Sequence, residues 1–128
     1  MRRTTLGILL LAATTATAAC AGNDVTSPTV TLAGTYNLRT INGTALPYNF
    51  GSGAVLTSDV LTLRNDGTYT DVGRWSDGST TTEQGAYSNS GGAITFDDYT
   101  DNVTYQGSLS GRVLTEITNG YTVTYQKN

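Results

Sequence analysis

The feature that most constrains this chain is the regular return of glycine-containing turns. From Ala33 to the end, runs rich in Thr, Val, Tyr and Leu alternate with such turns about every eight to twelve residues, a spacing typical of small β-sandwiches and barrels. No stretch of residues 33–128 has an apolar period of 3.6 residues, so no helix is expected there. Because parallel strands need long crossover connections, the sheet is predicted to be antiparallel.

Eight strands are predicted, and the second of them can break at Ser58. They cover residues 33–41, 54–64, 68–75, 79–88, 92–97, 102–108, 112–117 and 121–127. A meander of about eight strands loses its edges when it closes into an up-and-down barrel, so residues 33–128 are predicted to form one all-β barrel domain. Bends or bulges are expected at the glycines inside strands, Gly73, Gly85 and Gly107. Residues 42–54 interrupt the strand rhythm and are expected to fold over one mouth of the barrel.

Three turns set the predicted pairing register, which decides which side chains share a face. Residues 65–67, 109–111 and 118–120 each fit a three-residue hairpin loop that ends in glycine. These loops pair Leu63 with Tyr69 and gather one apolar inner face, made of Tyr105, Val113, Ile117, Tyr121, Val123 and Tyr125. Two-residue loops would instead put Glu116 opposite Val123 on that face, so the three-residue interpretation is preferred.

Residues 1–19 have the layout of a secretory signal peptide. Arg2 and Arg3 form a positively charged start, and residues 6–13 form a short apolar run. This run is shorter than the roughly 20 residues of a membrane-spanning helix. Residues 1–19 are therefore expected to direct export and to be removed.

Residues 17–20, Thr-Ala-Ala-Cys, resemble a bacterial lipobox. We therefore favour lipidation of Cys20, with residues 20–32 as the lipid anchor site and tether; ordinary cleavage after Ala18 or Ala19 is the alternative. The first interpretation predicts a lipoprotein of the cell envelope, held to a membrane through Cys20. In a cell with two membranes it would lie on the outer membrane or face the periplasm, and the alternative predicts a secreted protein.

Charge and composition exclude several classes of function. Arg2 and Arg3 lie in the signal segment, so five of the seven basic residues remain against ten acidic ones, a net charge of −5. An acidic surface repels phosphate backbones, so no nucleic-acid partner is expected. The chain has no histidine, and its single cysteine is the lipidation candidate. Without the commonest general base and metal ligand, we expect no enzyme, no metal site and no cofactor.

Two stretches resemble bacterial lipocalin-like domains. Residues 32–38, Leu-Ala-Gly-Thr-Tyr-Asn-Leu, and 41–47, Ile-Asn-Gly-Thr-Ala-Leu-Pro, are similar to their Gly-x-Trp start and the Asn-Gly and Leu-Pro loop that follows, with Tyr36 in the place of the tryptophan. Residues 61–69 also resemble the second hairpin of small envelope lipoproteins of this kind. The resemblance implies an eight-stranded barrel with room for a small apolar ligand.

Aromatic and aliphatic side chains are the candidate ligand-binding residues. Rings inside a barrel can line a cavity, or they can simply fill it, and the short strands favour filling. The candidates are Tyr36, Leu46, Tyr48, Phe50, Leu61, Leu63, Tyr69, Trp75, Tyr87, Phe96, Tyr105, Tyr121 and Tyr125.

Two groups of acidic residues are candidate sites. If residues 76–78 form a three-residue loop, Asp71 lies opposite Glu83 on the inner face, and the two carboxyl groups could share a proton. Facing like charges destabilise a sheet, so we expect a longer turn or a bulge to send at least one of them to solvent. Asp97, Asp98, Asp101 and Asn102 form an oxygen-rich turn, but their spacing matches no calcium loop.

The leading functional hypothesis is an envelope-anchored barrel that binds a small apolar or amphipathic molecule at the mouth covered by Leu46, Tyr48 and Phe50. The alternative is a non-enzymatic interaction protein with a filled barrel, either an envelope spacer or an inhibitor of a secreted hydrolase. The sequence names no protein partner for either. A hollow interior would favour the first hypothesis, and a packed interior the second.

Overall fold

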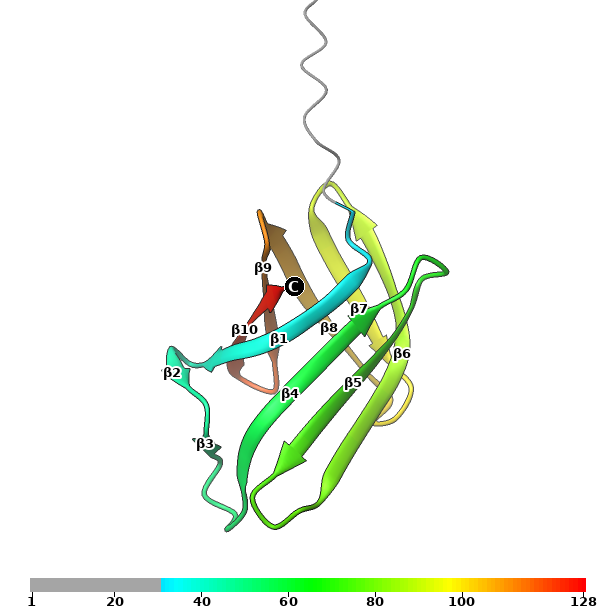
Figure 1. The fold of residues 1–128 in the computed structure, drawn as a ribbon. Coiled ribbons are helices and arrows are strands. Elements are labelled where there is room, and N and C mark those ends of the chain that lie inside the picture. The colour runs from blue at the N-terminus through cyan, green and yellow to red at the C-terminus, as the bar shows by residue number, and fades with distance from the viewer. Residues whose placement is uncertain (1–30) are drawn as a thin grey trace, which may run out of the picture.

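The computed structural model describes residues 31–128, which form an all-β domain (Figure 1). The strands are β1 (Gly34–Ile41), β2 (Thr44–Ala45), β3 (Tyr48–Asn49), β4 (Val55–Leu63), β5 (Thr68–Trp75), β6 (Thr80–Ser90), β7 (Ala93–Asp98), β8 (Val103–Ser110), β9 (Val113–Thr118) and β10 (Tyr121–Lys127). The long strands match the predicted ranges to within two residues at either end. The predicted signal peptide at 1–19 and most of the predicted tether at 20–32 lie outside the described residues. Within residues 31–128, no helix is long and apolar enough to cross a membrane.

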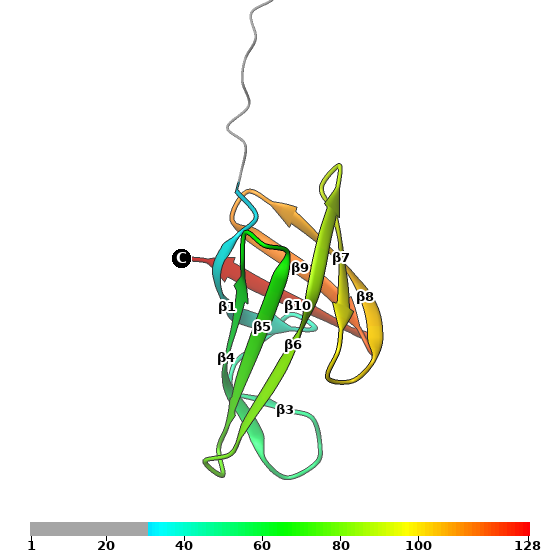
Figure 2. The same ribbon diagram turned by 90° about the vertical axis from the view of Figure 1, so that its right-hand side faces the viewer.

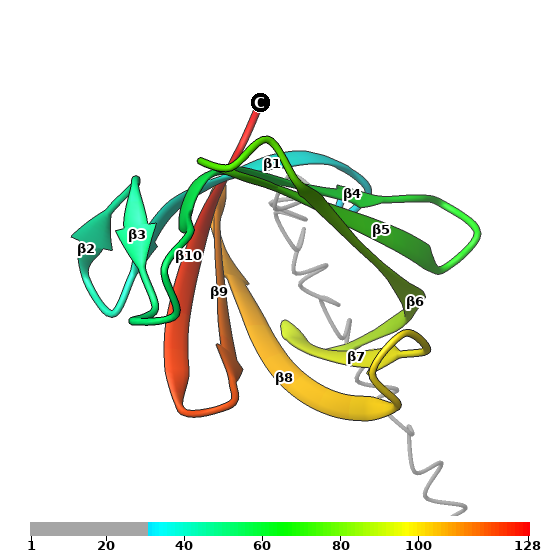
Figure 3. The same ribbon diagram turned by 90° about the horizontal axis from the view of Figure 1, so that it is seen from below.

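The long strands close into an eight-stranded antiparallel barrel. Strands β4 to β10 pair in chain order, and β1 pairs with both β10 and β4, so the sheet has no free long edge. Tyr36 of β1 shows this closure, because it lies opposite Lys127 on one side and Leu61 on the other. Figure 3 shows the strands as a ring around the interior, with the two-residue strands β2 and β3 to one side. The predicted antiparallel barrel is confirmed.

The predicted register is correct at one turn and wrong at two. Leu63 pairs with Tyr69 around residues 65–67, as expected. In contrast, β9 and β10 are joined by the two-residue turn Asn119-Gly120, whose residues have φ angles of 49° and 80°. Positive φ at both central residues is the type I′ hairpin, which matches the twist of the flanking strands. The β8–β9 turn is also two residues long, and Gly111 with φ 60° supplies the positive angle at its first position.

The shorter turns exchange the two faces of β9. Leu114 and Glu116 point into the barrel and are buried, whereas Val113 and Ile117 are 39% and 63% exposed. A slip of one residue moves every side chain of a strand to the other face of the sheet, so the prediction that Val113 and Ile117 lie inside is wrong. Val123 and Tyr125 of β10 are buried as predicted.

The two ends of the barrel differ. We call the end with the β4–β5, β6–β7 and β8–β9 turns the closed end (Figure 1). Large buried side chains pack there. There the ring of Phe96 stacks on Tyr105 at 5.0 Å between centroids and meets the edge of Tyr69 at 5.4 Å. The opposite end, with β3 and the β5–β6, β7–β8 and β9–β10 turns, is called the open end (Figures 1 and 2).

The strand glycines make room for side chains and do not shift the register. A Cβ atom on Gly85 would lie 1.9 Å from the carbonyl oxygen of Asp97 and 2.9 Å from the ring of Tyr69. The register shifts that do occur lie between Leu38 and Thr40 in β1 and between Leu56 and Ser58 in β4. The bulges expected at Gly73, Gly85 and Gly107 are therefore absent from these residues. The strand that could break at Ser58 is continuous over Val55–Leu63, with a shift of register but no break.

Candidate ligand-binding cavity

A cavity of about 350 Å³ occupies the part of the barrel toward the open end. Its walls include inward-facing residues of the eight long strands, and its rim includes residues of the adjoining turns. Phe50, Asp101 and Asn119 line it and are themselves exposed, so the cavity reaches the surface. The prediction that residues 42–54 fold over one mouth agrees with the position of Phe50.

Three aromatic rings stand at this rim. Phe50 follows β3, Trp75 ends β5, and Tyr121 begins β10 directly after the Asn119-Gly120 turn. The Phe50 ring lies 5.3 Å from that of Tyr121 and 5.9 Å from that of Trp75, between centroids. Tyr48 packs edge-on against Phe50 at 4.8 Å from behind. The rim therefore offers an apolar and aromatic surface to whatever enters.

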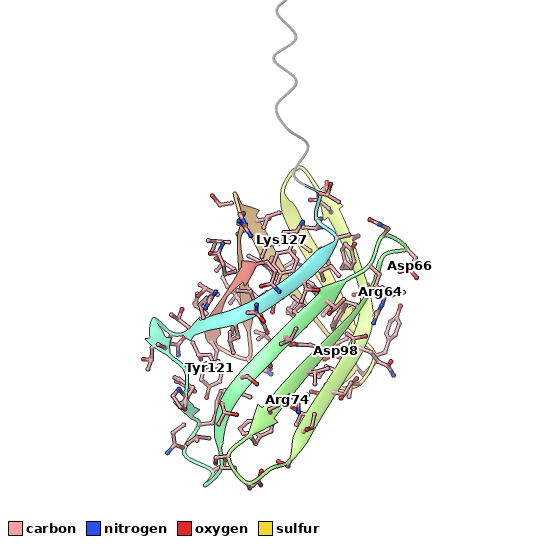
Figure 4. All side chains as sticks on the ribbon, viewed as in Figure 1. Arg64, Asp66, Arg74, Asp98, Tyr121 and Lys127 are labelled. Carbon is pink, nitrogen blue, oxygen red and sulfur yellow. The ribbon has the colours of Figure 1, made fainter. Side chains whose placement is uncertain are left out.

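The wall below the rim is acidic. Ten acidic residues occur in the chain, and Asp24 lies outside the described residues; of the other nine, six line the cavity. They are Asp59, Asp71, Glu83, Asp98, Asp101 and Glu116. No lysine or arginine is among the lining residues, and Figure 4 shows Arg64 and Lys127 toward the closed end. Five of the six carboxyl groups come from five different strands, because inward positions of β4, β5, β6, β7 and β9 each carry one.

Asp59 and Asp71 share the hydroxyl group of Tyr125. The Tyr125 oxygen lies 3.2 Å from Oδ1 of Asp59 and 3.1 Å from Oδ2 of Asp71. A phenol has one proton, so it can donate to only one carboxylate at a time. Burial raises the pKa of Asp71 well above its usual range, and the hydrogen bond and negative charge of Asp59 raise it further. These effects favour the protonated form of Asp71.

Glu83, Asp98 and Asp101 form a second acidic group, with one carboxylate oxygen of each within 4.8 Å of the others. Burial raises the pKa of Glu83 to about 7, assisted by the charges of Asp98 and Asp101. Asp98 is buried, and its Oδ1 accepts hydrogen bonds from the backbone N–H groups of Thr100 at 2.7 Å and Asp101 at 3.3 Å.

Glu116 is the most deeply placed acid of the cavity. Its side chain is 3% exposed, and its Oε1 atom has no hydrogen-bond partner among the described residues. The Oδ1 atom of Asp71 is likewise buried and unpartnered. Burial raises the pKa of Glu116 to about 8, and the charges of Asp59 and Glu83 act in the same direction. An unpaired buried polar atom is rare in proteins and costs stability, so these two atoms call for an explanation.

Asp71 and Glu83 lie directly opposite each other, an arrangement that the sequence allows but that their like charges disfavour. Residues 76–78 form a three-residue turn, in which the N–H of Trp75 donates to the carbonyl of Ser79. The expectation that a longer turn or bulge sends one carboxyl group to solvent is wrong, because both line the cavity. Protonation reduces the repulsion that motivated this expectation.

The acidic residues at the end of β7 and in the turn that follows lie on different faces of the sheet. Asp97 is exposed on the outer face, where it accepts a hydrogen bond from the Thr104 hydroxyl, and Asn102 is also exposed. Asp98 and Asp101 face the cavity, where Glu83 from β6 joins them. The sequence grouping of Asp97 with Asp98 therefore does not form one cluster of oxygen ligands.

The thirteen candidate ligand-binding residues fall into three groups. Phe50, Trp75, Tyr105, Tyr121 and Tyr125 line the cavity. The group packed in the buried core consists of Tyr36, Leu61, Leu63, Tyr69 and Phe96. Leu46, Tyr48 and Tyr87 pack against that core from its margin, and Tyr87 donates its hydroxyl proton to the carbonyl of Arg64.

Asp59 and Glu116 are cavity residues that the sequence analysis did not select. The sequence does contain a signal for Asp59. It stands two and four residues before Leu61 and Leu63, and alternate residues of a strand point to the same face. The three-residue turn predicted at residues 118–120 places Glu116 on the outer face, whereas the actual two-residue turn places it inside.

No protein-family model and no curated protein matches this chain. Among solved structures, it is similar to a lipocalin-like protein from Bacteroides uniformis, with a TM-score of 0.52 and 21% sequence identity. The match covers 76% of this chain and 98% of that one. Together with the closed eight-stranded antiparallel barrel, this similarity shows that residues 31–128 have a lipocalin-like fold.

Proposed function

We propose that this protein binds a small amphipathic molecule inside its barrel. The observation that carries the proposal is the cavity of about 350 Å³ that reaches the surface between Phe50, Trp75 and Tyr121. This volume lies within the range of about 300–1,000 Å³ typical of small-molecule sites, and an apolar rim with a few convergent polar groups is their usual lining. The lipocalin-like fold supports the same function class.

We also propose that the protein is a lipoprotein held at the cell envelope through Cys20. The chain enters the barrel at the closed end, where Gly34 of β1 pairs with Leu63 of β4 (Figures 1 and 2). A tether attached there would leave the cavity at the far end of the barrel, accessible from the side away from the membrane. Metabolic labelling with a radioactive fatty acid tests this, and label retained by a Cys20→Ala variant would contradict it.

Binding is proposed in preference to catalysis or to a purely structural role. The hollow open end favours the binding hypothesis over the filled spacer or inhibitor. The opposed carboxyl groups of Asp71 and Glu83 favour acid–base chemistry, but no histidine, lysine, arginine or cysteine lines the cavity beside them. Chemical change of a bound molecule, detected by mass spectrometry after incubation, would contradict the binding proposal.

Trp75 provides the test, because it is the chain's only tryptophan and stands at the rim. Titration of the full chain with the neutral fluorescent probe N-phenyl-1-naphthylamine should give saturable probe emission and a matching change in tryptophan emission. Phe50→Ala should weaken probe binding, because it removes the ring that packs between Trp75 and Tyr121. Val113→Ala is the matched control, since Val113 is exposed on the outer face of β9. Absence of saturable binding would overturn the proposal.

A further inference from the structure

The charge of the cavity restricts what it can bind. Six carboxyl side chains line its wall, and no lysine or arginine does. Inside a protein the effective dielectric constant is far below that of water, so such a wall repels anions and attracts cations. Residues 31–128 contain five basic residues, Arg39, Arg64, Arg74, Arg112 and Lys127, and none of them is among the lining residues, so the acidic net charge alone does not account for this pattern.

Two buried acceptors in this wall lack donors. Oε1 of Glu116 and Oδ1 of Asp71 have no hydrogen-bond partner among residues 31–128, and both side chains line the same cavity. A donor that enters the cavity would satisfy them. An ammonium group carries three N–H donors and a positive charge, and hydrogen bonds between charged partners are about twice as strong as neutral ones.

We propose that the ligand is a small organic ammonium ion, whose charged group is held by Glu116 and the Asp59–Asp71 pair and whose apolar part lies against Phe50, Trp75 and Tyr121. This inference rests on the proposed function and names its ligand class. Deep carboxyl groups below an aromatic rim match a molecule with one cationic and one apolar end. Aromatic faces add attraction for a cation as it passes the rim.

A bare metal ion fits the cavity less well. The triad Glu83, Asp98 and Asp101 offers three oxygen ligands, but Oδ1 of Asp98 already accepts two backbone hydrogen bonds. Neither unpartnered acceptor belongs to this triad. A metal ion would also leave the aromatic rim without a role.

Without a bound cation, the carboxyl group of Glu116 favours its protonated form at the position proposed for the charge of the ligand. The ionisable groups that interact with the charge of Glu116 come from β4, β5, β6, β8 and β10. Each is a carboxyl group or a phenol, and none is basic: Asp59, Tyr69, Asp71, Glu83, Tyr105 and Tyr125. Because burial, with the charges of Asp59 and Glu83, raises the pKa of Glu116 to about 8, it is largely protonated at pH 7. Uptake of a cation should therefore release protons, and affinity should rise between pH 6 and pH 8.5.

Three ligands of similar size separate charge from shape: 2-phenylethylamine, 2-phenylethanol and 3-phenylpropanoate. Calorimetric titration of the full chain at pH 7.5 should show the amine binding at least about tenfold more tightly than the alcohol, with no measurable binding of the acid. Repeating the amine titration in buffers of different ionisation enthalpy should show proton release.

Variants locate the charge contact. Glu116→Gln keeps the side-chain shape and should weaken amine binding by about tenfold while leaving alcohol binding within about twofold. Asp97→Asn is the matched control, since it removes a carboxylate from the outer face beside Asp98. Equal losses in both variants would overturn the assignment of the charged group to Glu116.

The outcomes distinguish the two proposals. If the neutral probe and the alcohol bind as tightly as the amine, the cation inference fails and the binding function stands. If neither the three ligands nor N-phenyl-1-naphthylamine binds, both fail. If the amine does not bind but calcium does, and Glu83→Gln abolishes calcium binding, the ligand is a metal ion and not an organic cation.

Discussion

Glu116 and Val123 lie directly opposite each other on β9 and β10, so a buried carboxyl group faces a buried isopropyl group inside the barrel. The pairing follows from the two-residue turn at Asn119-Gly120, which turns Glu116 inward and Ile117 outward. Burying a carboxyl group without a partner costs free energy that an apolar residue would not. The chain therefore carries an internal acidic group that its packing does not require.

This placement makes stability depend on pH. The folded-state pKa of Glu116, about 8, lies above the ordinary value of 4.5, so the native state holds the proton more tightly than the unfolded state. The contribution of Glu116 is fully present below pH 4.5 and is lost as the pH rises through 8. In Glu116→Gln the free energy of unfolding should therefore fall less from pH 5 to pH 8.5 than in the unchanged protein, by on the order of 4 kcal/mol.

Urea unfolding at the two pH values measures this difference. Asp97→Asn is again the control, because Asp97 is exposed on the outer face. The same pH dependence in Glu116→Gln as in the unchanged protein would show that Glu116 does not titrate in a buried state.

The barrel follows from local signals in the sequence, whereas the site depends on one register. Glycine turns and alternating β-branched residues mark each strand over only a few neighbours, so the strand ranges could be predicted closely. The inner face of β9 depends on whether one turn has two or three residues. Placing Glu116 outside follows a sound rule for a packed core, and the rule fails here because Glu116 lines a cavity.

Some of the acidic wall was nevertheless predictable. A three-residue turn at residues 76–78 implies that Asp71 lies opposite Glu83, although their like charges favour an arrangement with one of them in solvent. Asp59 shares the inward alternation of Leu61 and Leu63. What sequence patterns do not give is the volume that side chains leave empty. The closed end is filled by Tyr69, Phe96 and Tyr105, and only packing in three dimensions shows that the same filling stops short of the open end.

The turn that sets this register can be tested at Gly120. Its φ of 80° lies in the left-handed region, where a Cβ atom costs roughly 1–2 kcal/mol. Gly120→Ala should lower the free energy of unfolding by about that amount, although no atom crowds the position. Asn119→Gly is the control, since glycine adopts the φ of 49° found there without strain. A neutral effect of Gly120→Ala in urea unfolding would contradict the type I′ turn.

Gly85 should be the least replaceable strand glycine. A Cβ atom there would overlap the backbone carbonyl of Asp97, which cannot move without disturbing the β6–β7 pairing. Gly85→Ala is expected to destabilise the barrel by on the order of 3 kcal/mol, through overpacking. Thr82→Ala, on the exposed face of the same strand, should change stability by less than about 0.5 kcal/mol. Similar melting temperatures for the two variants would show that β6 and β7 do not approach as closely as described.

The Tyr125 hydroxyl is expected to stabilise the close approach of the Asp59 and Asp71 carboxyl groups. Its hydroxyl lies within hydrogen-bond distance of both Asp59 and Asp71, and the buried pair has no basic neighbour to offset its charge. Tyr125→Phe keeps the ring but removes this donor, so the pKa of Asp71 should rise further and the free energy of unfolding at pH 7 should fall by about 1–2 kcal/mol. Tyr99→Phe, at a ring that is 68% exposed, is the control and should be neutral. The titration of the Asp71 carboxyl carbon, followed by NMR, should move to higher pH in Tyr125→Phe, because the Tyr125 hydrogen bond lowers the pKa of Asp71. An unchanged titration would show that the Tyr125 hydroxyl does not bond to this pair.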